Sequence, residues 1–214
     1  MINKMIYFRK QQKIFCIGLN KTGTSSLLKA MIDFQYNVAD QPDAEMLIHD
    51  YAKRDFRQLL EYCKKYNFFQ DIPFSCPFTF TAIDFTFPKS KFILSVRNTG
   101  EEWYNSLVKF HSKLFGKNGG VPTYQDLMNA NYRYKGFIWD AMSITYNSQP
   151  EDPYCKNRLI DVYENHNRMV KEYFRYRPND LLIINLSVPT SYLQLCGFLD
   201  KDPLYDKMPW ENKT

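Results

Sequence analysis

The sequence predicts an α/β protein with a mainly parallel sheet that helices cover on both faces. Short apolar runs alternate along the chain with longer stretches of helical periodicity, which is typical of strand–helix–strand units. The strand-like runs show no polar alternation, and this indicates strands that are buried on both faces. The 214 residues contain no internal repeat, Pro/Gly-rich linker or low-complexity tract, so we expect a single domain over residues 1–214.

The first half of the chain is predicted to hold three strands and the helices between them. Branched and aromatic residues that end at a glycine predict a strand over 13–18, and a polar turn then leads into a helix over 25–34. Residues 42–66 are predicted to form one or two helices. A short strand is expected over 67–70, and the apolar run KFILSV predicts a buried strand over 91–96.

The second half is predicted to be mostly helical. Thr99 and Glu102 have the spacing of a capping box, which predicts a helix from there to about residue 114. The glycine-containing segment 115–122 is expected to be a loop. Further helices are predicted over 123–146, 156–175 and 190–199, and a last interior strand over 181–185.

Charge points to an anionic ligand. The chain has a formal net charge of +5 and a pI near 8.8. Lysine and arginine are spread along the sequence and form no basic block of the kind that marks a nucleic-acid binder. We therefore expect a small anionic ligand and no nucleic-acid partner.

The N-terminus and the cysteines indicate the compartment. The longest apolar run is IFCIGL, far shorter than the ~20 residues that a membrane-spanning helix needs. The first residues carry charges where a signal peptide would be apolar. Five scattered cysteines form no CxxC pair, so neither a zinc site nor a disulfide framework is predicted. We expect a cytoplasmic protein without a transmembrane segment.

A candidate phosphate-binding loop follows the first predicted strand. The segment 18–25 has the length of a Walker A loop, G-x4-G-K-[ST], and lies between a strand and a helix as that motif requires. Thr24 stands where the Walker lysine would be, and Lys21 is the only cation of the loop. Backbone N–H groups at a helix N-terminus, with the loop's hydroxyl groups, bind anionic oxygens. The loop therefore predicts a phosphate-like ligand other than a nucleoside triphosphate.

A second anion-binding residue follows the strand predicted over 91–96. A nucleoside triphosphatase would place an aspartate at such a strand end to help hold magnesium, whereas this chain has Arg97. A guanidinium pairs bidentately with phosphate. Ser106 lies about two turns into the following helix and could donate to the same group. These two residues predict a second phosphate on the ligand.

Both motifs resemble those of the sulfotransferase family. The segment Lys21-Thr-Gly-Thr-Ser-Ser26 is similar to the loop that binds the 5′-phosphosulfate, and the segment from Arg97-Asn98 to Trp103-Tyr-Asn-Ser106 is similar to the 3′-phosphate motif. Thr99-Gly100 stands where members of the family often have proline, with one extra residue before the serine. Weaker similarity continues through 70–73, 163–167, 177–178, 181–187, 195–199 and 209–214, so it covers nearly the whole chain.

The resemblance implies a three-layer P-loop-like fold and the transfer of a sulfuryl group. The donor would be 3′-phosphoadenosine 5′-phosphosulfate (PAPS), the product adenosine 3′,5′-bisphosphate, and no metal would take part. Lys21 is expected on the oxygen that bridges sulfur and phosphorus, where charge grows as that bond breaks. The residues expected to bind the nucleotide are Asn20, Lys21, Thr22, Gly23, Thr24, Ser25, Ser26, Arg97, Ser106, Asn212 and Lys213.

Transfer also needs a base that takes the proton of the acceptor hydroxyl or amine. In Gln70-Asp-Ile-Pro73, Asp71 aligns with the place of the base in one branch of the family, although an aspartate with an ordinary pKa near ~3.9 is a weak base unless it is desolvated. His166 and His111 are the alternatives as base, although His111 is expected to pack or lie at the surface. The expected catalytic residues are thus Lys21, Asp71 and His166.

The acceptor and two other functions stay open on the sequence alone. The acceptor could be a glycan, a lipid or a small molecule, bound by the segments 40–57 and 116–147. One alternative is a P-loop kinase or nucleoside triphosphatase in which Asp71 or Asp84 holds magnesium. The other is a non-catalytic nucleotide-binding module that recruits a partner.

Overall fold

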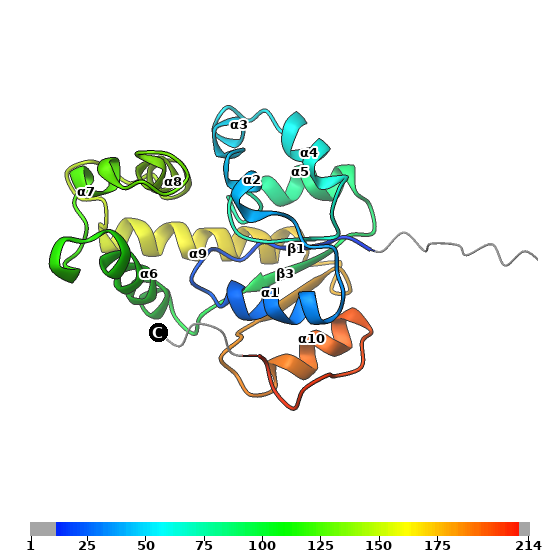
Figure 1. Ribbon diagram of the computed structural model, residues 1–214. Helices are drawn as coiled ribbons and strands as arrows, with labels where there is room; N and C mark the ends of the chain where they lie inside the picture. Colours follow the sequence, from blue (N-terminus) through cyan, green and yellow to red (C-terminus); the bar gives the residue numbers. More distant parts are fainter. Residues whose placement is uncertain (1–11, 210–214) are drawn as a thin grey trace, which may run out of the picture.

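The computed structural model describes residues 12–209 and contains one parallel sheet (Figure 1). Its strand order is β2-β1-β3-β4. In register, Phe15 lies opposite both Phe69 and Phe92, and Ile93 lies opposite Leu182. The strands are β1 (Ile14–Cys16), β2 (Phe68–Phe69), β3 (Lys91–Ser95) and β4 (Leu181–Ile184).

Helices cover both faces of the sheet, which confirms the predicted α/β architecture (Figure 1). Successive residues of a strand point to opposite faces. Ile14 and Cys16 therefore pack with the helices on one face, whereas Phe15 packs on the other and stacks on Phe69 at 4.5 Å between ring centroids. The covering helices are α1 (Thr24–Asp33) and α10 (Ser191–Leu199) on the first face, and α5 (Thr79–Thr86) and α9 (Lys156–Tyr173) on the second.

A second lobe lies beside the sheet and is built around an aromatic core. Trp103, Phe137, Met142 and Tyr163 are buried together there. No helix of the described residues is long and apolar enough to cross a membrane. The remaining helices are α2 (Gln41–Glu45), α3 (Ile48–Ala52), α4 (Arg57–Cys63), α6 (Gly100–Phe115), the short 3₁₀ helix Lys117–Gly119, α7 (Tyr124–Asn129) and α8 (Phe137–Tyr146).

Two helical predictions were wrong in detail, and α5 was not predicted. Residues 42–66 form three short helices: Asp40 caps the first by accepting from the Asp43 N–H at 3.0 Å, and Arg54, which has a left-handed φ of 58°, interrupts the helical backbone before the third. Residues 123–146 form two helices, separated before Gly136, which has a left-handed φ of 93°.

Half of the predicted capping box is present at the start of α6. The Thr99 hydroxyl accepts from the Glu102 N–H at 3.0 Å. The Glu102 carboxylate, however, accepts from the Asn98 N–H at 3.2 Å, one residue before the N-cap. The helix still begins where the sequence predicts it.

The end of β1 lies so close to β3 that only glycine fits at position 18. A Cβ there would lie 2.3 Å from both the carbonyl oxygen and the Oγ of Ser95. We expect Gly18→Ala to lower the free energy of unfolding by about 1–3 kcal/mol, because the two strands must move apart. Gly197→Ala is the control, since nothing lies within 4 Å of its added Cβ. A thermal melt in which Gly18→Ala is no less stable than Gly197→Ala would contradict this close approach.

Candidate functional site

The loop between β1 and α1 lies at the carboxyl ends of the parallel strands, where α/β proteins bind ligands. Lys21 and Gly23 have left-handed backbones, with φ of 67° and 102°. The Thr22 hydroxyl ties the loop down through hydrogen bonds of 2.6 Å to the Leu19 carbonyl and to Ser95 Oγ. Gly23 gives α1 no side-chain cap, so the N-terminal N–H groups of this helix can receive an anion.

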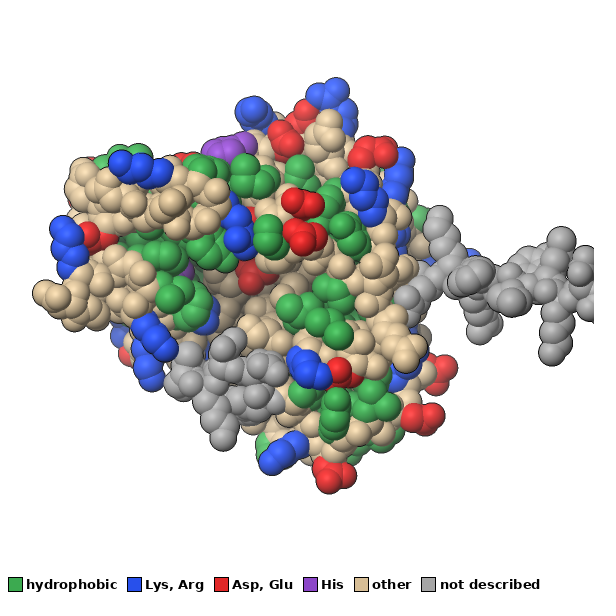
Figure 2. Space-filling view, viewed as in Figure 1, with side chains coloured by type: hydrophobic (Ala, Val, Ile, Leu, Met, Phe, Trp, Pro, Cys, Tyr) green, Lys and Arg blue, Asp and Glu red, His purple; other side chains and the backbone are tan. Residues whose placement is uncertain are grey.

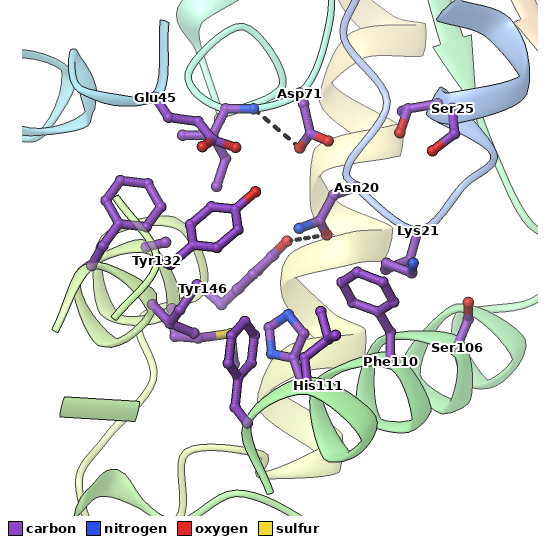
Figure 3. Close-up of a pocket in the computed structure, with 18 of the residues that line it drawn as sticks. Asn20, Lys21, Ser25, Glu45, Asp71, Ser106, Phe110, His111, Tyr132 and Tyr146 are labelled. Carbon is purple, nitrogen blue, oxygen red and sulfur yellow. Dashed lines mark hydrogen bonds between the residues drawn. The ribbon is translucent and has the colours of Figure 1, made fainter. Parts of the chain in front are cut away.

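Aromatic side chains from three helices hold the loop in place. Trp103 Nε1 donates to the Asn20 carbonyl at 2.9 Å. The Tyr146 hydroxyl donates to Asn20 Oδ1 at 2.7 Å (Figure 3). The Trp103 ring stacks on Tyr163, with 4.7 Å between centroids. The Tyr163 hydroxyl in turn accepts from the Arg97 N–H at 2.8 Å. These contacts use both oxygens of Asn20 and leave its amide nitrogen for a ligand.

Arg97 and the loop meet directly, as the sequence argument requires. Arg97 Nε donates to the Lys21 carbonyl at 2.9 Å, and Nη1 lies 3.9 Å from Glu102 Oε1. Arg97 also lines the same cavity as the loop. The two predicted anion-binding groups are not on separate surfaces.

Ser106 lines the cavity beside Lys21 (Figure 3). Its Oγ is buried and has no hydrogen-bond partner among the described residues. A buried hydroxyl without a partner costs free energy, which a bound acceptor oxygen would recover. The extra residue in the Arg97–Ser106 segment has not turned this serine away from the site.

The cavity has a volume of about 280 Å³ and joins the loop to the second lobe (Figure 3). The half of the cavity beside the loop is lined mainly by polar side chains, and the half beside the second lobe is lined mainly by aromatic and aliphatic side chains. The lining residues are Asn20, Lys21, Gly23, Thr24, Ser25, Glu45, Asp71, Ile72, Arg97, Ser106, Phe110, His111, Leu114, Phe115, Tyr132, Phe137, Ile138, Ala141, Met142 and Tyr146.

Lys21 lies where the two halves of the cavity meet. Its ammonium sits over the Phe110 ring, 3.3 Å from the centroid. Burial lowers the pKa of Lys21 to about 8; the Asp71 carboxylate opposes this shift, and the Arg97 guanidinium adds to it. This ammonium is therefore a desolvated positive charge in contact with an apolar ring.

Asp71 faces the cavity from the segment that follows β2. The carboxylate accepts from the Ile72 N–H at 3.1 Å. Burial raises the pKa of Asp71, while the Ile72 N–H and the Lys21 ammonium oppose the shift. A carboxylate with a raised pKa is a stronger base than an exposed one, as sulfuryl transfer would need.

His166 is placed apart from these groups. Its ring is buried under β1, where Nε2 donates to the Ile17 carbonyl at 2.7 Å. Nδ1 has no partner among the described residues, and burial lowers the pKa of His166 to about 4. The imidazole does not line the cavity, so the geometry favours Asp71 over His166 as the base.

The other expected residues divide into three groups. Thr24 and Ser25 line the cavity with Lys21, whereas Thr22 and Ser26 are buried beside it. Asn212 and Lys213 lie outside the described residues. Asp84, the alternative magnesium ligand, instead pairs with Arg177 at 2.8 Å and does not line the cavity. Across residues 12–209, no group of three or more His, Cys, Asp or Glu side chains could hold a metal ion.

Several lining residues were missed, although α6 carried a signal for them. Phe110 and Leu114 follow Ser106 at spacings of four and eight, which place them on one face of a helix, and His111 lies three residues before Leu114. His111 is buried, and its Nδ1 shares a hydrogen bond of 2.7 Å with the Tyr154 hydroxyl. Burial lowers the pKa of His111 to about 3 and the Lys21 charge adds to the shift, so its imidazole is neutral.

Comparison with known proteins agrees with this geometry. A family model described as the sulfotransferase domain matches residues 13–214, a range that includes the loop, Arg97, Ser106 and Asp71. No curated protein matches the chain. The fold, the order of the two anion-binding motifs and this match along nearly the whole sequence place the chain in the sulfotransferase family, whose reaction is the transfer of a sulfuryl group.

Proposed function

We propose that this protein transfers the sulfuryl group of PAPS to an acceptor, with Asp71 as the base. The observation that carries the proposal is the unpartnered Ser106 Oγ, which faces the same cavity as Lys21 and Arg97. These three residues offer two anion-binding places in one cavity. PAPS carries negative charge at both the 5′ and the 3′ position of its ribose, whereas a nucleoside triphosphate carries it in one chain.

Each end of the donor has its own set of protein groups. Lys21, Thr24, Ser25 and the N-terminus of α1 would hold the 5′-phosphosulfate through an ammonium, hydroxyl groups and backbone N–H groups. Arg97 and Ser106 would hold the 3′-phosphate through charge-assisted hydrogen bonds. Arg97 is hydrogen-bonded to the Lys21 carbonyl, so the groups that would bind the two ends of PAPS are directly connected.

The chemical step then needs one proton acceptor and one positive charge. Asp71 takes the proton from the acceptor hydroxyl or amine as its oxygen or nitrogen bonds to sulfur. The bond between sulfur and the bridging oxygen breaks, and its electron pair stays on the departing adenosine 3′,5′-bisphosphate. The Lys21 ammonium stabilises the charge that grows on that oxygen. The products are the sulfated acceptor and the bisphosphate.

Calorimetry with adenosine 3′,5′-bisphosphate, and with ATP plus magnesium for comparison, tests the donor. We expect binding of the bisphosphate without a metal and weaker binding of ATP. No binding of the bisphosphate, together with magnesium-dependent binding of ATP, would contradict the proposal and favour a kinase or triphosphatase. If the bisphosphate binds but PAPS is neither transferred nor hydrolysed, the protein is a nucleotide-binding module.

Ser106→Ala is expected to weaken binding of the bisphosphate by about tenfold or more, because a hydrogen bond to a charged phosphate is worth ~1.5–3 kcal/mol. Binding of adenosine 5′-monophosphate, which has no 3′-phosphate, should not change. The control is Asn105→Ala, an exposed neighbour on α6 that does not line the cavity. Equal weakening of both ligands would place Ser106 away from the 3′-phosphate.

A further inference from the structure

The half of the cavity beyond Lys21 has its own character, and we call it the acceptor chamber. Its walls come from α6, from α8 and from the segment that precedes α8. Aromatic and aliphatic side chains make up those walls. They are Phe110, Leu114, Phe115, Tyr132, Phe137, Ile138, Ala141, Met142 and the ring of Tyr146.

The polar groups of this chamber are mostly committed to protein partners. The Tyr146 hydroxyl donates to Asn20 Oδ1 at 2.7 Å. His111 uses Nδ1 with the Tyr154 hydroxyl, also at 2.7 Å. These contacts hold the lobe to the loop, and among the described residues they leave the Asn20 amide nitrogen and His111 Nε2 without a hydrogen bond.

Glu45, the carboxylate opposite Asp71, is committed as well (Figure 3). It forms an ion pair with the Arg133 guanidinium, and Oε1 accepts from Gln41 Nε2 at 3.3 Å. A second nitrogen of Arg133 donates to the Tyr132 hydroxyl at 3.3 Å. The Glu45 carboxylate and the Arg133 guanidinium therefore already satisfy each other.

Asp71 is different, because the hydrogen bond that the Ile72 N–H donates to it occupies only Oδ1. Asp71 lines the cavity, and its other carboxylate oxygen accepts no hydrogen bond from the described residues. An acceptor hydroxyl directed at Asp71 would donate a hydrogen bond to this second oxygen. It would lie beside Lys21, where the sulfuryl group is expected. The rest of the acceptor would meet rings and aliphatic chains.

We propose that the acceptor is a small, largely apolar alcohol or phenol whose single hydroxyl points at Asp71, and that glycans are excluded. This rests on the proposed function, since it uses the same catalytic groups. A sugar carries a hydroxyl on most carbons, and each one buried without a partner costs ~1–3 kcal/mol. An apolar body instead gains free energy as its surface leaves water.

Size and access agree with a small acceptor. A cavity of about 280 Å³ is slightly smaller than the usual range for ligand pockets, ~300–1,000 Å³, and the phosphosulfate would take part of it. Leu114 and Tyr132, which are 50% and 44% exposed, lie at the edge of the chamber. Figure 2 shows the surface hollowed between the lobe of α7 and α8 and the part that carries α1.

The test uses 2-naphthol as the apolar probe and N,N′-diacetylchitobiose as the glycan probe. Binding of each to the full-length protein with saturating adenosine 3′,5′-bisphosphate is measured by equilibrium dialysis, and turnover of each with PAPS is measured alongside. We expect 2-naphthol to bind and to be sulfated, and the disaccharide to do neither. Binding of the disaccharide, or no binding of 2-naphthol, would overturn the proposal.

Two variants locate the binding at the chamber. Ala141→Phe fills the space between the walls, and Leu114→Glu puts a charge at its edge; each should weaken 2-naphthol binding by about tenfold or more. Leu114 is half exposed, so its variant should fold even if Ala141→Phe does not. Val121→Glu is the matched control, because Val121 is 54% exposed and does not line the cavity.

The two proposals fail in distinguishable ways. Binding of the bisphosphate should change by less than about twofold in all three variants, because its contacts lie elsewhere. If the bisphosphate does not bind the wild-type protein, the proposed function fails. If it binds, but Leu114→Glu and Val121→Glu bind 2-naphthol equally well, only the acceptor chamber is wrong.

Discussion

Replacing Asp71 by asparagine is expected to lower kcat by about 10²–10⁴-fold, the usual contribution of a general base. The amide has the shape of the carboxylate and can keep the hydrogen bond from the Ile72 N–H, but it cannot take the acceptor's proton. Binding of adenosine 3′,5′-bisphosphate should not change, because Asp71 faces the acceptor. Initial rates with PAPS and 2-naphthol, together with calorimetry, measure both quantities.

The dependence on pH separates a base from a merely structural aspartate. Burial raises the pKa of Asp71, so in the wild-type protein kcat should fall as the pH drops through that raised pKa and the carboxylate becomes protonated. Asp71→Asn should lose this acidic limb. The control is Asp43→Asn, an exposed residue of α2 that does not line the cavity. An unchanged kcat in Asp71→Asn would remove Asp71 from the mechanism.

Lys21→Met is expected to lower kcat by about 10²–10³-fold, as the loss of one group that stabilises the transition-state charge usually does. A methionine side chain has a similar length and can keep the contact with Phe110, but it offers no positive charge to the bridging oxygen of PAPS. Binding of the donor should weaken as well, since the ammonium also faces the ground-state phosphosulfate. Lys109→Met, an exposed residue of the same helix as Phe110, is the control.

Lys21 should also make nucleotide binding depend on pH. Its pKa of about 8 in the free protein means that the side chain is charged below that pH and increasingly neutral above it. An anionic ligand favours the charged form, so binding should weaken as the pH rises above 8 and should take up protons there. Calorimetry in two buffers of different ionisation heat measures this uptake. Lys21→Met should take up none; equal uptake in both proteins would assign the proton to another group.

The local sequence predicted closely the strands and the position of the loop between β1 and α1, because each depends on neighbouring residues. The strand expected over 181–185 is Leu181–Ile184, and the helix expected over 25–34 is Thr24–Asp33. The contact between Arg97 and the loop was also predictable, since parallel strands bring their carboxyl ends to one edge of the sheet.

The environments of the titratable groups were not predictable in the same way. The raised pKa of Asp71 arises from burial by the whole cavity, and no neighbour in sequence reports it. His166 lies on a helix, and the sequence does not show which of two packed surfaces its ring meets. In the structure the ring meets β1 and donates to the Ile17 carbonyl, away from the cavity. Distances of this kind are set by tertiary packing.

The hydrogen bond from Tyr146 to Asn20 limits how this enzyme can diverge. Tyr146 lines the chamber and also supports the loop. A substitution of Tyr146 that suits a new substrate would therefore also disturb catalysis on every other substrate. Ala141, Met142 and Leu114 also line the chamber, but their side chains form no hydrogen bond with the loop. We expect relatives with a different acceptor preference to differ at these three positions and to keep a tyrosine at the position of Tyr146.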